Sequence, residues 1–315
     1  MNRHPIIIDT DPGVDDAFAI MMALCEPNID IRAYTTTCGN VGLKTTTRNM
    51  LGLKHLLNLD TAVYAGAEQP LAIPFKDASD VHGDSGLGYY QFSEVSKLSA
   101  DEYAWDAIYR IAKECNGIDI VALGPLTNIA IALLRYPDLP KYIRRVISMG
   151  GTIGYGNTAP YSEFNYWCDP LAAKLVLESE LNVVMVGLNA TRQTLLSVED
   201  MERLKPKNPK IAEFTQAQNA FYWERLLAKG LKGFHLPDAV AVAYLLDPEV
   251  LHVEEKPVKV ITDSGIKQGW TVVDLRRHVD TKLKTISVAL SADKERYLKL
   301  LLRINHLLEE EYVQN

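Results

Sequence analysis

The sequence predicts an open α/β fold, in which a mostly parallel sheet is flanked by helices on both sides. Apolar strand-like runs alternate with helix-like runs along most of the chain, the pattern that parallel strands joined by crossover helices produce. The strand-like runs are 5–9, 29–37, 61–66, 117–123, 144–151 and 182–188. The helix-like runs are 14–26, 44–58, 101–116, 126–135, 169–179 and 209–229.

The first of these units is the clearest. Residues 5–8 (Pro-Ile-Ile-Ile) are wholly apolar, as expected of a parallel strand buried on both faces. Pro12 and Gly13 form a turn, and Asp15 begins the helix-like run. The unit therefore predicts a buried strand, a tight turn and a helix in immediate succession.

The C-terminal part has a different pattern. Three strand-like runs, 256–263, 270–276 and 284–290, indicate a small strand-rich addition. The last predicted helix, 291–310, has apolar residues at helical spacing and begins with Ser-Ala-Asp. Because no linker, repeat or low-complexity run divides the chain, we expect one domain over residues 1–315.

Composition indicates a soluble protein with a large core. The chain has 315 residues, of which 47% are hydrophobic, so a sizeable core can form. The net charge of −7 argues against a surface that binds nucleic acid. The four cysteines are scattered without a CxxC pair, which fits neither a disulfide framework nor a zinc site.

The sequence carries no signal-like or membrane-like segment. The N-terminus has no long apolar stretch after its basic residues, and no run approaches the roughly twenty apolar residues of a membrane span. We therefore expect a cytoplasmic protein without a membrane partner.

A cluster of carboxylates follows the first strand. Asp9, Asp11, Asp15 and Asp16 fall close together at the carboxyl end of that strand, where open α/β folds bind their ligands. Such anions repel one another unless a cation lies among them, and oxygen ligands suit a hard divalent cation. Helix capping and the helix dipole explain one or two of these residues, but not all four.

The segment that contains this cluster, residues 9–20 (DTDPGVDDAFAI), resembles the N-terminal signature of the inosine-uridine-preferring nucleoside hydrolases. Further segments similar to that family, in the family's order, are 81–88, 124–133, 156–173 and 237–248. The resemblance implies the nucleoside hydrolase fold and hydrolysis of the N-glycosidic bond of ribonucleosides to free nucleobase and ribose. It also implies a homodimer or homotetramer.

The same resemblance implies a Ca²⁺ site. Asp11, Asp16 and Asp238 match the family's carboxylate ligands, and Leu123 holds the position whose backbone carbonyl supplies another. Calcium prefers several oxygens and leaves room for water and substrate hydroxyls. As an alternative, Asp238 is a residue of the first turn of a helix that starts at Pro237. The resemblance assigns Asp11 a second role, as the base that takes a proton from the activated water.

The sugar site is predicted from the segment around residue 160. Asn157, Glu163 and Asn165 line up with the family's ribose contacts, and so does Asp15. These side chains offer the donors and acceptors that a polyol needs, although a surface loop with an incidental Glu would look similar. The predicted substrate contacts are Asp15, Asn40, His82, Met149, Asn157, Glu163, Phe164, Asn165, Tyr222 and Trp223.

The sequence departs from the best-known members at the leaving-group acid. Those members carry a histidine directly before the late aspartate, whereas this chain has Pro237, which cannot donate a proton. His82, which matches a family histidine near the nucleobase, and His235 are the candidate catalytic donors. Structural roles for both histidines remain open. The aromatic residues that could stack on the base are Tyr161, Trp167, Tyr222 and Trp223, with core packing as the alternative.

Two other functions compete. An apolar strand followed by Asp-x-Asp also opens the haloacid-dehalogenase-type phosphohydrolases, although Gly13 stands where that family needs Thr or Val. A non-catalytic nucleoside- or sugar-binding protein would also keep the pocket. Release of free base and ribose separates all three functions.

Overall fold

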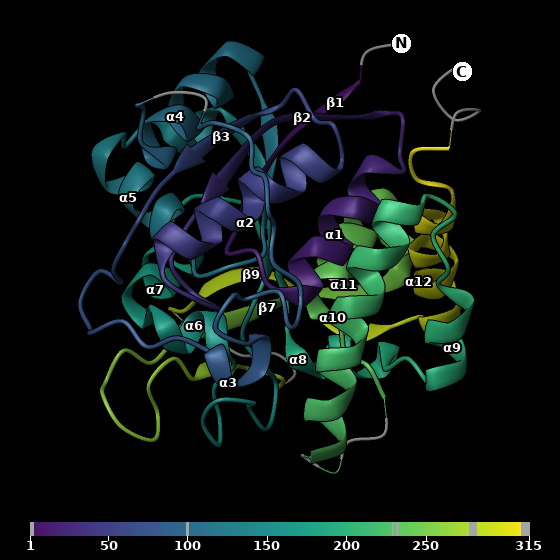
Figure 1. Ribbon diagram of the computed structural model, residues 1–315. Coiled ribbons are helices and arrows are strands. Elements are labelled where there is room, and N and C mark those ends of the chain that lie inside the picture. Colours follow the sequence, from purple (N-terminus) through teal and green to yellow (C-terminus); the bar gives the residue numbers. More distant parts are fainter. Residues whose placement is uncertain (1–2, 99–100, 229, 231–232, 277–281, 310–315) are drawn as a thin grey trace.

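One sheet organises the part of the chain that the computed structural model describes, residues 3–98, 101–228, 230, 233–276 and 282–309. Within these residues the sheet has nine strands in the order β3-β2-β1-β4-β5-β6-β9-β7-β8 (Figure 1). Strands β1 to β6 pair in parallel, and β9 is parallel to β6. Only β7 and β8 add antiparallel pairs to this described sheet. The predicted mostly parallel α/β sheet is confirmed.

The strands agree closely with the apolar runs. Their bounds are β1 (His4–Thr10), β2 (Ile29–Thr36), β3 (Ala62–Ala65), β4 (Ile118–Ala122), β5 (Ile143–Met149), β6 (Val183–Val186), β7 (Leu251–Val260), β8 (Thr271–Val273) and β9 (Lys284–Ala292).

Helices cover both faces of the sheet, as predicted (Figure 1). Ile6 and Ile8 of β1 belong to one buried cluster and Ile7 to the other, because successive strand side chains point to opposite faces. The first cluster is packed by α1 (Val14–Leu24), α2 (Leu43–Leu56), α10 (Pro209–Ala228), α11 (Pro237–Leu246) and α12 (Lys294–Leu301). The second is packed by α4 (Ala104–Cys115), α5 (Thr127–Arg135) and α7 (Pro170–Leu177).

The predicted strand-rich C-terminal part is confirmed, since each of its three runs contains a strand, but its place in the sheet was not predicted. Strands β7, β8 and β9 extend the main sheet, because β9 pairs directly with β6 through Val184 with Ser287 and Met185 with Val288. Alternating apolar residues in the 284–290 run gave no information about which strand would be its neighbour.

The predicted last helix, 291–310, begins too early. Ser291 still pairs with His252 in the β7–β9 ladder, so the strand continues to Ala292. Asp293 then caps α12, accepting a hydrogen bond from the backbone N–H of Arg296 at 3.0 Å. The helix ends at Leu301 and a 3₁₀ turn follows; residue 310 lies outside the described residues.

Four short helices were not predicted, because each is too short to show helical periodicity. They are α3 (Ser79–His82), α6 (Phe164–Cys168), α8 (Leu188–Thr191) and α9 (Val198–Arg203). Among the described helices, none is long and apolar enough to cross a membrane.

Candidate active site

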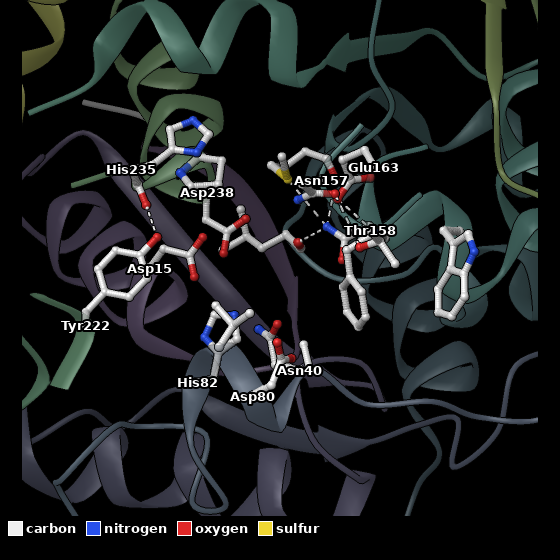
Figure 2. A pocket seen from close by; sticks show the side chains of 18 of the residues that line it. Asp15, Asn40, Asp80, His82, Asn157, Thr158, Glu163, Tyr222, His235 and Asp238 are labelled. Carbon is white, nitrogen blue, oxygen red and sulfur yellow. Dashed lines mark hydrogen bonds between the residues drawn. The ribbon is translucent and has the colours of Figure 1, made fainter. Parts of the chain in front are cut away.

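A cavity of about 780 Å³ opens where the parallel strands end. Residues that follow successive strands contribute to its lining: Asp15 after β1, Asn40 after β2, Leu123 after β4, Met149 at the end of β5 and Arg192 after β6. In an open α/β sheet this edge is where ligands bind. Figure 2 shows Asp15 and Asp238 between Tyr222 and His235 on one side and Asn157 and Glu163 on the other.

Three carboxylates meet at the wall of this cavity, two in its lining and Asp16 behind it. Asp15, Asp16 and Asp238 each place a carboxylate oxygen within 4.8 Å of the others. Asp15 and Asp16 lie in the first turn of α1, and Asp238 lies in the first turn of α11. Pro237 suits the first position of α11, since its missing N–H would have no partner within the helix. Asp238 is therefore also a residue of the first helical turn, which was the alternative interpretation of it from the sequence.

Asp16 is held firmly by neighbouring donors. Its Oδ1 accepts from Thr10 Oγ1 at 2.5 Å, and its Oδ2 accepts from the Gly13 N–H at 2.8 Å and Asn40 Nδ2 at 3.1 Å. These bonds fix the carboxylate in one orientation at the start of the helix. Asn40, which follows β2 and donates to Asp16, also lines the cavity.

Asp11 lies in a tight backbone cradle beside the three carboxylates. Its Oδ2 accepts from the Asn40 backbone N–H at 2.6 Å, whereas its buried Oδ1 has no hydrogen-bond partner among the described residues. A Cβ added at Gly39 would lie 2.0 Å from Oδ2, and one at Gly124 would lie 2.5 Å from Oδ1. Both positions need glycine, because the backbone approaches the carboxylate closely.

The remaining acidic residue of the N-terminal segment, Asp9, has a different environment. Its Oδ1 accepts from Thr35 Oγ1 at 2.6 Å and from Asn128 Nδ2 at 2.7 Å. These bonds connect the ends of β1 and β2 to α5, so Asp9 supports the sheet edge beneath the cavity.

The carboxylates are costly to ionise without a cation. Burial, followed by the charge of Asp16, raises the pKa of Asp15 to about 7. Burial and the neighbouring carboxylates also raise the pKa values of Asp11 and Asp238 well above the usual range. A divalent cation would relieve this repulsion, and an all-oxygen donor set with an unpartnered Asp11 oxygen fits a hard cation.

The opposite side of the cavity is organised by Glu163. This residue caps α6, and its carboxylate accepts from the backbone N–H groups of Asn165 at 2.8 Å, Tyr166 at 3.2 Å and Gly151 at 2.9 Å. Burial raises its pKa to about 7 despite these donors. Glu163 is therefore fixed by the backbone before any ligand binds.

Asn165 connects the ends of β4 and β5. Its Nδ2 donates to the Leu123 carbonyl at 2.6 Å and to the Met149 carbonyl at 3.0 Å. A carbonyl oxygen has two lone pairs, so the Leu123 oxygen keeps one for a second partner. The predicted role of the Leu123 carbonyl as a metal ligand is compatible with its hydrogen bond to Asn165.

The two candidate histidines lie in the same cavity but in different environments. His82 Nδ1 accepts from the Val14 backbone N–H at 3.4 Å, which leaves the proton of a neutral ring on Nε2. His235 Nε2 lies 3.0 Å from Thr191 Oγ1, and its carbonyl accepts from the Tyr222 hydroxyl at 2.9 Å (Figure 2). Burial and then the charge of Arg192 lower the pKa of His235 to about 4, so it is neutral at neutral pH.

Most of the predicted site residues gather around the cavity. Those in its lining are Asp15, Asn40, His82, Leu123, Met149, Asn157, Glu163, Phe164, Asn165, Tyr222, His235 and Asp238. Asp11 and Asp16 lie next to this lining, buried behind it.

Two of the four aromatic candidates point elsewhere. The Trp223 ring stacks on Phe234 with a centroid distance of 5.1 Å, and Tyr161 packs against Trp270 at 5.1 Å. Neither belongs to the lining formed by the described residues, whereas Tyr222 and Trp167 do. For Trp223 the packing alternative considered from the sequence therefore applies.

Several lining residues were missed from the sequence. They are Lys76, Asp77, Asp80, Tyr155, Arg192, Leu195 and Arg225. Arg192 follows β6, so its place after the carboxyl end of a parallel strand is a signal that could have found it. Arg225 sits late in the long helix α10, and its residue type gave no comparable signal.

Comparison with known families settles the class of this site. The family model described as inosine-uridine preferring nucleoside hydrolase matches residues 6–299. The chain belongs to this family. The nucleoside hydrolase is 39% identical to the non-specific ribonucleoside hydrolase RihC of Klebsiella pneumoniae subsp. pneumoniae over 294 residues, which cover 93% of this chain and 95% of that one. RihC of Escherichia coli strain SMS-3-5 is 37% identical over 292 residues, covering 92% and 94%.

Solved structures agree with the sequence relatives. A plant nucleoside hydrolase, PpNRh1, superposes with a TM-score of 0.90 at 33% identity and covers 96% of this chain and 99% of its own. A purine-preferring ribonucleoside hydrolase from Gardnerella vaginalis gives a TM-score of 0.89 at 32% identity, covering 96% and 98%.

The nucleoside hydrolase is therefore an enzyme that hydrolyses the N-glycosidic bond of ribonucleosides. The haloacid-dehalogenase-type alternative is wrong, because the family match runs through the whole sheet and its ligand-binding edge. Enzymes of this family depend on a metal ion, and Asp15, Asp16 and Asp238 form a group that could hold one.

Proposed function

We propose that this nucleoside hydrolase uses one Ca²⁺ at the carboxylate cluster to hydrolyse ribonucleosides to free nucleobase and ribose. The observation that carries the proposal is the arrangement of one cavity. Buried carboxylates lie at its wall, and a prearranged set of polar groups, Glu163 and Asn165, also lines it. A ribose diol between these two sets would contact both.

In this proposal Asp11, Asp16, Asp238 and the Leu123 carbonyl hold the ion, with Asp15 close enough to contribute to ion or sugar binding. These oxygens fill about half of the 6–8 positions that calcium accepts, which leaves places for water and substrate hydroxyls. A divalent cation supplies positive charge that lowers the pKa of the attacking water.

The protein's own groups would do the remaining work. Asp11 Oδ1, the oxygen with no partner among the described residues, would accept the proton of the water. Glu163, Asn165 and Asn157 would orient the ribose. Because cleavage builds positive charge on the sugar ring, nearby carboxylates also stabilise the transition state.

Leaving-group activation is proposed for His82. Pro237 cannot donate a proton, and the low pKa of His235 keeps that ring uncharged, which disfavours it as a general acid. His82 lines the cavity with its Nδ1 turned to Val14, so Nε2 is the nitrogen that would donate. Tyr222 is the aromatic residue that we propose beside the base.

Base preference is the open part of the substrate class. The relatives include a non-specific enzyme and a purine-preferring one. Since RihC is similar to this chain over nearly its full length, we propose that the enzyme accepts both purine and pyrimidine ribonucleosides. If His82 did not supply the proton that Pro237 cannot donate, purines should be the poorer substrates.

The proposal is tested by steady-state kinetics on inosine, adenosine, guanosine, uridine and cytidine, with free base and ribose both quantified. We expect equal amounts of base and ribose from every substrate that turns over. Binding of nucleosides without release of either product would instead support a binding protein. A homodimer or homotetramer remains a prediction, which sedimentation velocity measures.

A further inference from the structure

We propose that Arg192 is a positioning residue of this enzyme, which fixes the turn that carries Asn157 by binding two successive carbonyl groups at the base of that turn. The inference rests on the proposed function, in which Asn157 contacts the ribose. Arg192 itself acts through the turn, and its side chain is already engaged by the protein.

The contacts of Arg192 are specific for a guanidinium group. Its Nη1 donates to the Tyr155 carbonyl at 2.7 Å, and its Nη2 donates to the Gly156 carbonyl at 2.7 Å. Its Cζ also lies 3.8 Å from the centroid of the Tyr155 ring. A planar fork can make both bonds and the ring contact at once, whereas a lysine ammonium is a point charge on a flexible stem.

The turn beyond these carbonyls is closed on itself. The Gly156 N–H donates to the Pro160 carbonyl at 3.0 Å, and the Asn157 N–H donates to the Ser162 carbonyl at 3.2 Å. A Cβ at Gly156 would lie 2.1 Å from the Ser162 oxygen, so the two arms of the turn are in close contact. The turn can therefore move as one small unit, and its orientation depends on how its base is attached.

Asn157 has little else to fix it. It is an exposed residue, and its Oδ1 accepts from Thr158 Oγ1 at 3.3 Å, a neighbour on the same turn. That bond does not tie the side chain to the body of the protein. The placement of Asn157 in the cavity thus follows the placement of the backbone of its turn.

The segment of α8 that follows β6 supplies two attachments, in addition to Thr152 Oγ1, which donates to the Tyr155 carbonyl at 3.1 Å. Asn189 in α8 accepts from the Ile153 N–H at 3.2 Å and donates to the Ala289 carbonyl of β9 at 2.8 Å. Arg192 makes the second attachment three residues later. Between the two lies Gly154, whose φ of +104° favours glycine.

The test uses four variants: Arg192→Ala, Arg192→Lys, Asn157→Ala and the double variant Arg192→Ala/Asn157→Ala. Substrates are uridine and its 2′-, 3′- and 5′-deoxy analogues. We expect Arg192→Ala to raise KM for uridine roughly tenfold with kcat changed only a few-fold, the size expected for loss of a positioned hydrogen bond. Arg192→Lys should recover only part of this loss.

The double variant decides whether Arg192 acts through Asn157. We expect the KM of the double variant to match that of Asn157→Ala alone. In both single variants, kcat/KM should no longer depend on one particular ribose hydroxyl, and it should be the same hydroxyl in both. Independent, multiplicative losses, or sensitivity to a different hydroxyl, would overturn the inference. Arg303→Ala, which removes a surface arginine paired with Glu26 at 3.1 Å, is the matched control and should behave as wild type.

Failure of the proposed function gives a different result. If Asn157→Ala has wild-type kinetics, the proposed sugar contact is wrong, and the inference about Arg192 fails with it. If Asn157→Ala is impaired but Arg192→Ala is not, only the inference fails. Thermal unfolding and circular dichroism show whether each variant folds. If Arg192→Ala does not fold, the same comparison is made with Arg192→Lys, Asn157→Ala and the double variant Arg192→Lys/Asn157→Ala.

Discussion

Asp16 at the start of α1 and Asp238 at the start of α11 bring their carboxylate oxygens within 4.8 Å of each other. The two helices pack together on one face of the sheet, where Ala239 and Ala241 of α11 are fully buried. Helix packing therefore holds two like charges together that would separate if either helix were free. A cation between them changes an unfavourable contact into a favourable one.

This relationship predicts opposite effects of neutralising substitutions with and without metal. In chelator, Asp238→Asn should raise the melting temperature, because a repulsive contact is removed. Asp16→Asn should not raise it, because an amide NH2 would face donors from which the carboxylate now accepts. Addition of Ca²⁺ should raise the melting temperature of these variants less than that of the wild type. In the presence of Ca²⁺, the kcat/KM of each variant for uridine should be lower than that of the wild type by about a hundredfold or more. Thermal melts and calorimetric Ca²⁺ titrations measure both effects, with the exposed Asp60→Asn as control.

A lower melting temperature of Asp238→Asn in chelator would contradict the repulsion argument. Unchanged Ca²⁺ affinity would contradict the assignment of the ligands.

The raised carboxyl pKa values predict how the stability of the metal-free enzyme depends on pH. The pKa of Asp15 rises from 3.8 to about 7 and that of Glu163 from 4.5 to about 7, so in this range the folded state binds more protons than the unfolded state. Their contribution is full below the unfolded-state values and is lost as pH rises through about 7.

The melting temperature in chelator should thus fall between pH 5 and pH 8, and saturating Ca²⁺ should restore more of it at pH 8 than at pH 5. Melts at constant ionic strength in both conditions provide the measurement. If the melting temperature of the metal-free enzyme instead rises from pH 5 to pH 8, the carboxyl pKa values are not raised in the folded state.

The sugar site predicts strong discrimination against missing hydroxyl groups. Removing the 2′-hydroxyl would leave buried polar groups without partners, so kcat/KM for 2′-deoxyuridine should be lower than for uridine by roughly a hundredfold or more. Glu163→Gln should lower kcat/KM for uridine and reduce the ratio of kcat/KM for uridine to that for 2′-deoxyuridine, because the carboxylate that lines the cavity is lost. Equal kcat/KM values for the two nucleosides in the wild type would mean that the hydroxyl is not read.

The two histidines predict distinct kinetic signatures. His82→Ala should lower kcat for inosine by about 10²–10⁴-fold, the usual contribution of a general acid, with a smaller loss for uridine. His235→Ala should change either rate by only a few-fold, because a ring with a pKa of about 4 is already neutral at neutral pH. Single-turnover kinetics on both substrates separate chemistry from product release. Selective loss of purine activity in His235→Ala would reverse the assignment.

The sheet could be predicted from the sequence because buried parallel strands are continuous apolar runs. Residues 5–9, 117–123 and 144–151 each became strands of the sheet centre. The 284–290 run was also recognised as a strand, but its neighbour was not, since pairing with β6 depends on contacts far apart in the chain. A strand can be recognised from its own residues, whereas the order of strands in the sheet depends on contacts between distant segments.

The site was predictable where carboxyl ends of strands carry acidic or amide residues. Asp15, which was expected from the end of the first strand, lines the cavity. Glu163 lines it too, but was expected only from its match to the family's ribose contacts. Trp223 was placed wrongly among the candidates for the base, because one helix presents Tyr222 to the cavity and Trp223 to Phe234, and residue type alone does not distinguish these faces. Arg192 was missed although it follows the carboxyl end of β6, and its two partners, backbone carbonyls, could not be identified from residue types.

The central claim, that the carboxylate cluster binds a Ca²⁺ required for hydrolysis, is tested most directly by uridine turnover in metal-depleted enzyme. After exhaustive chelation, with metal content confirmed by elemental analysis, we predict no turnover. Activity should then return on addition of Ca²⁺ and saturate at one ion per chain. Full turnover by enzyme whose metal content is close to zero would contradict the account.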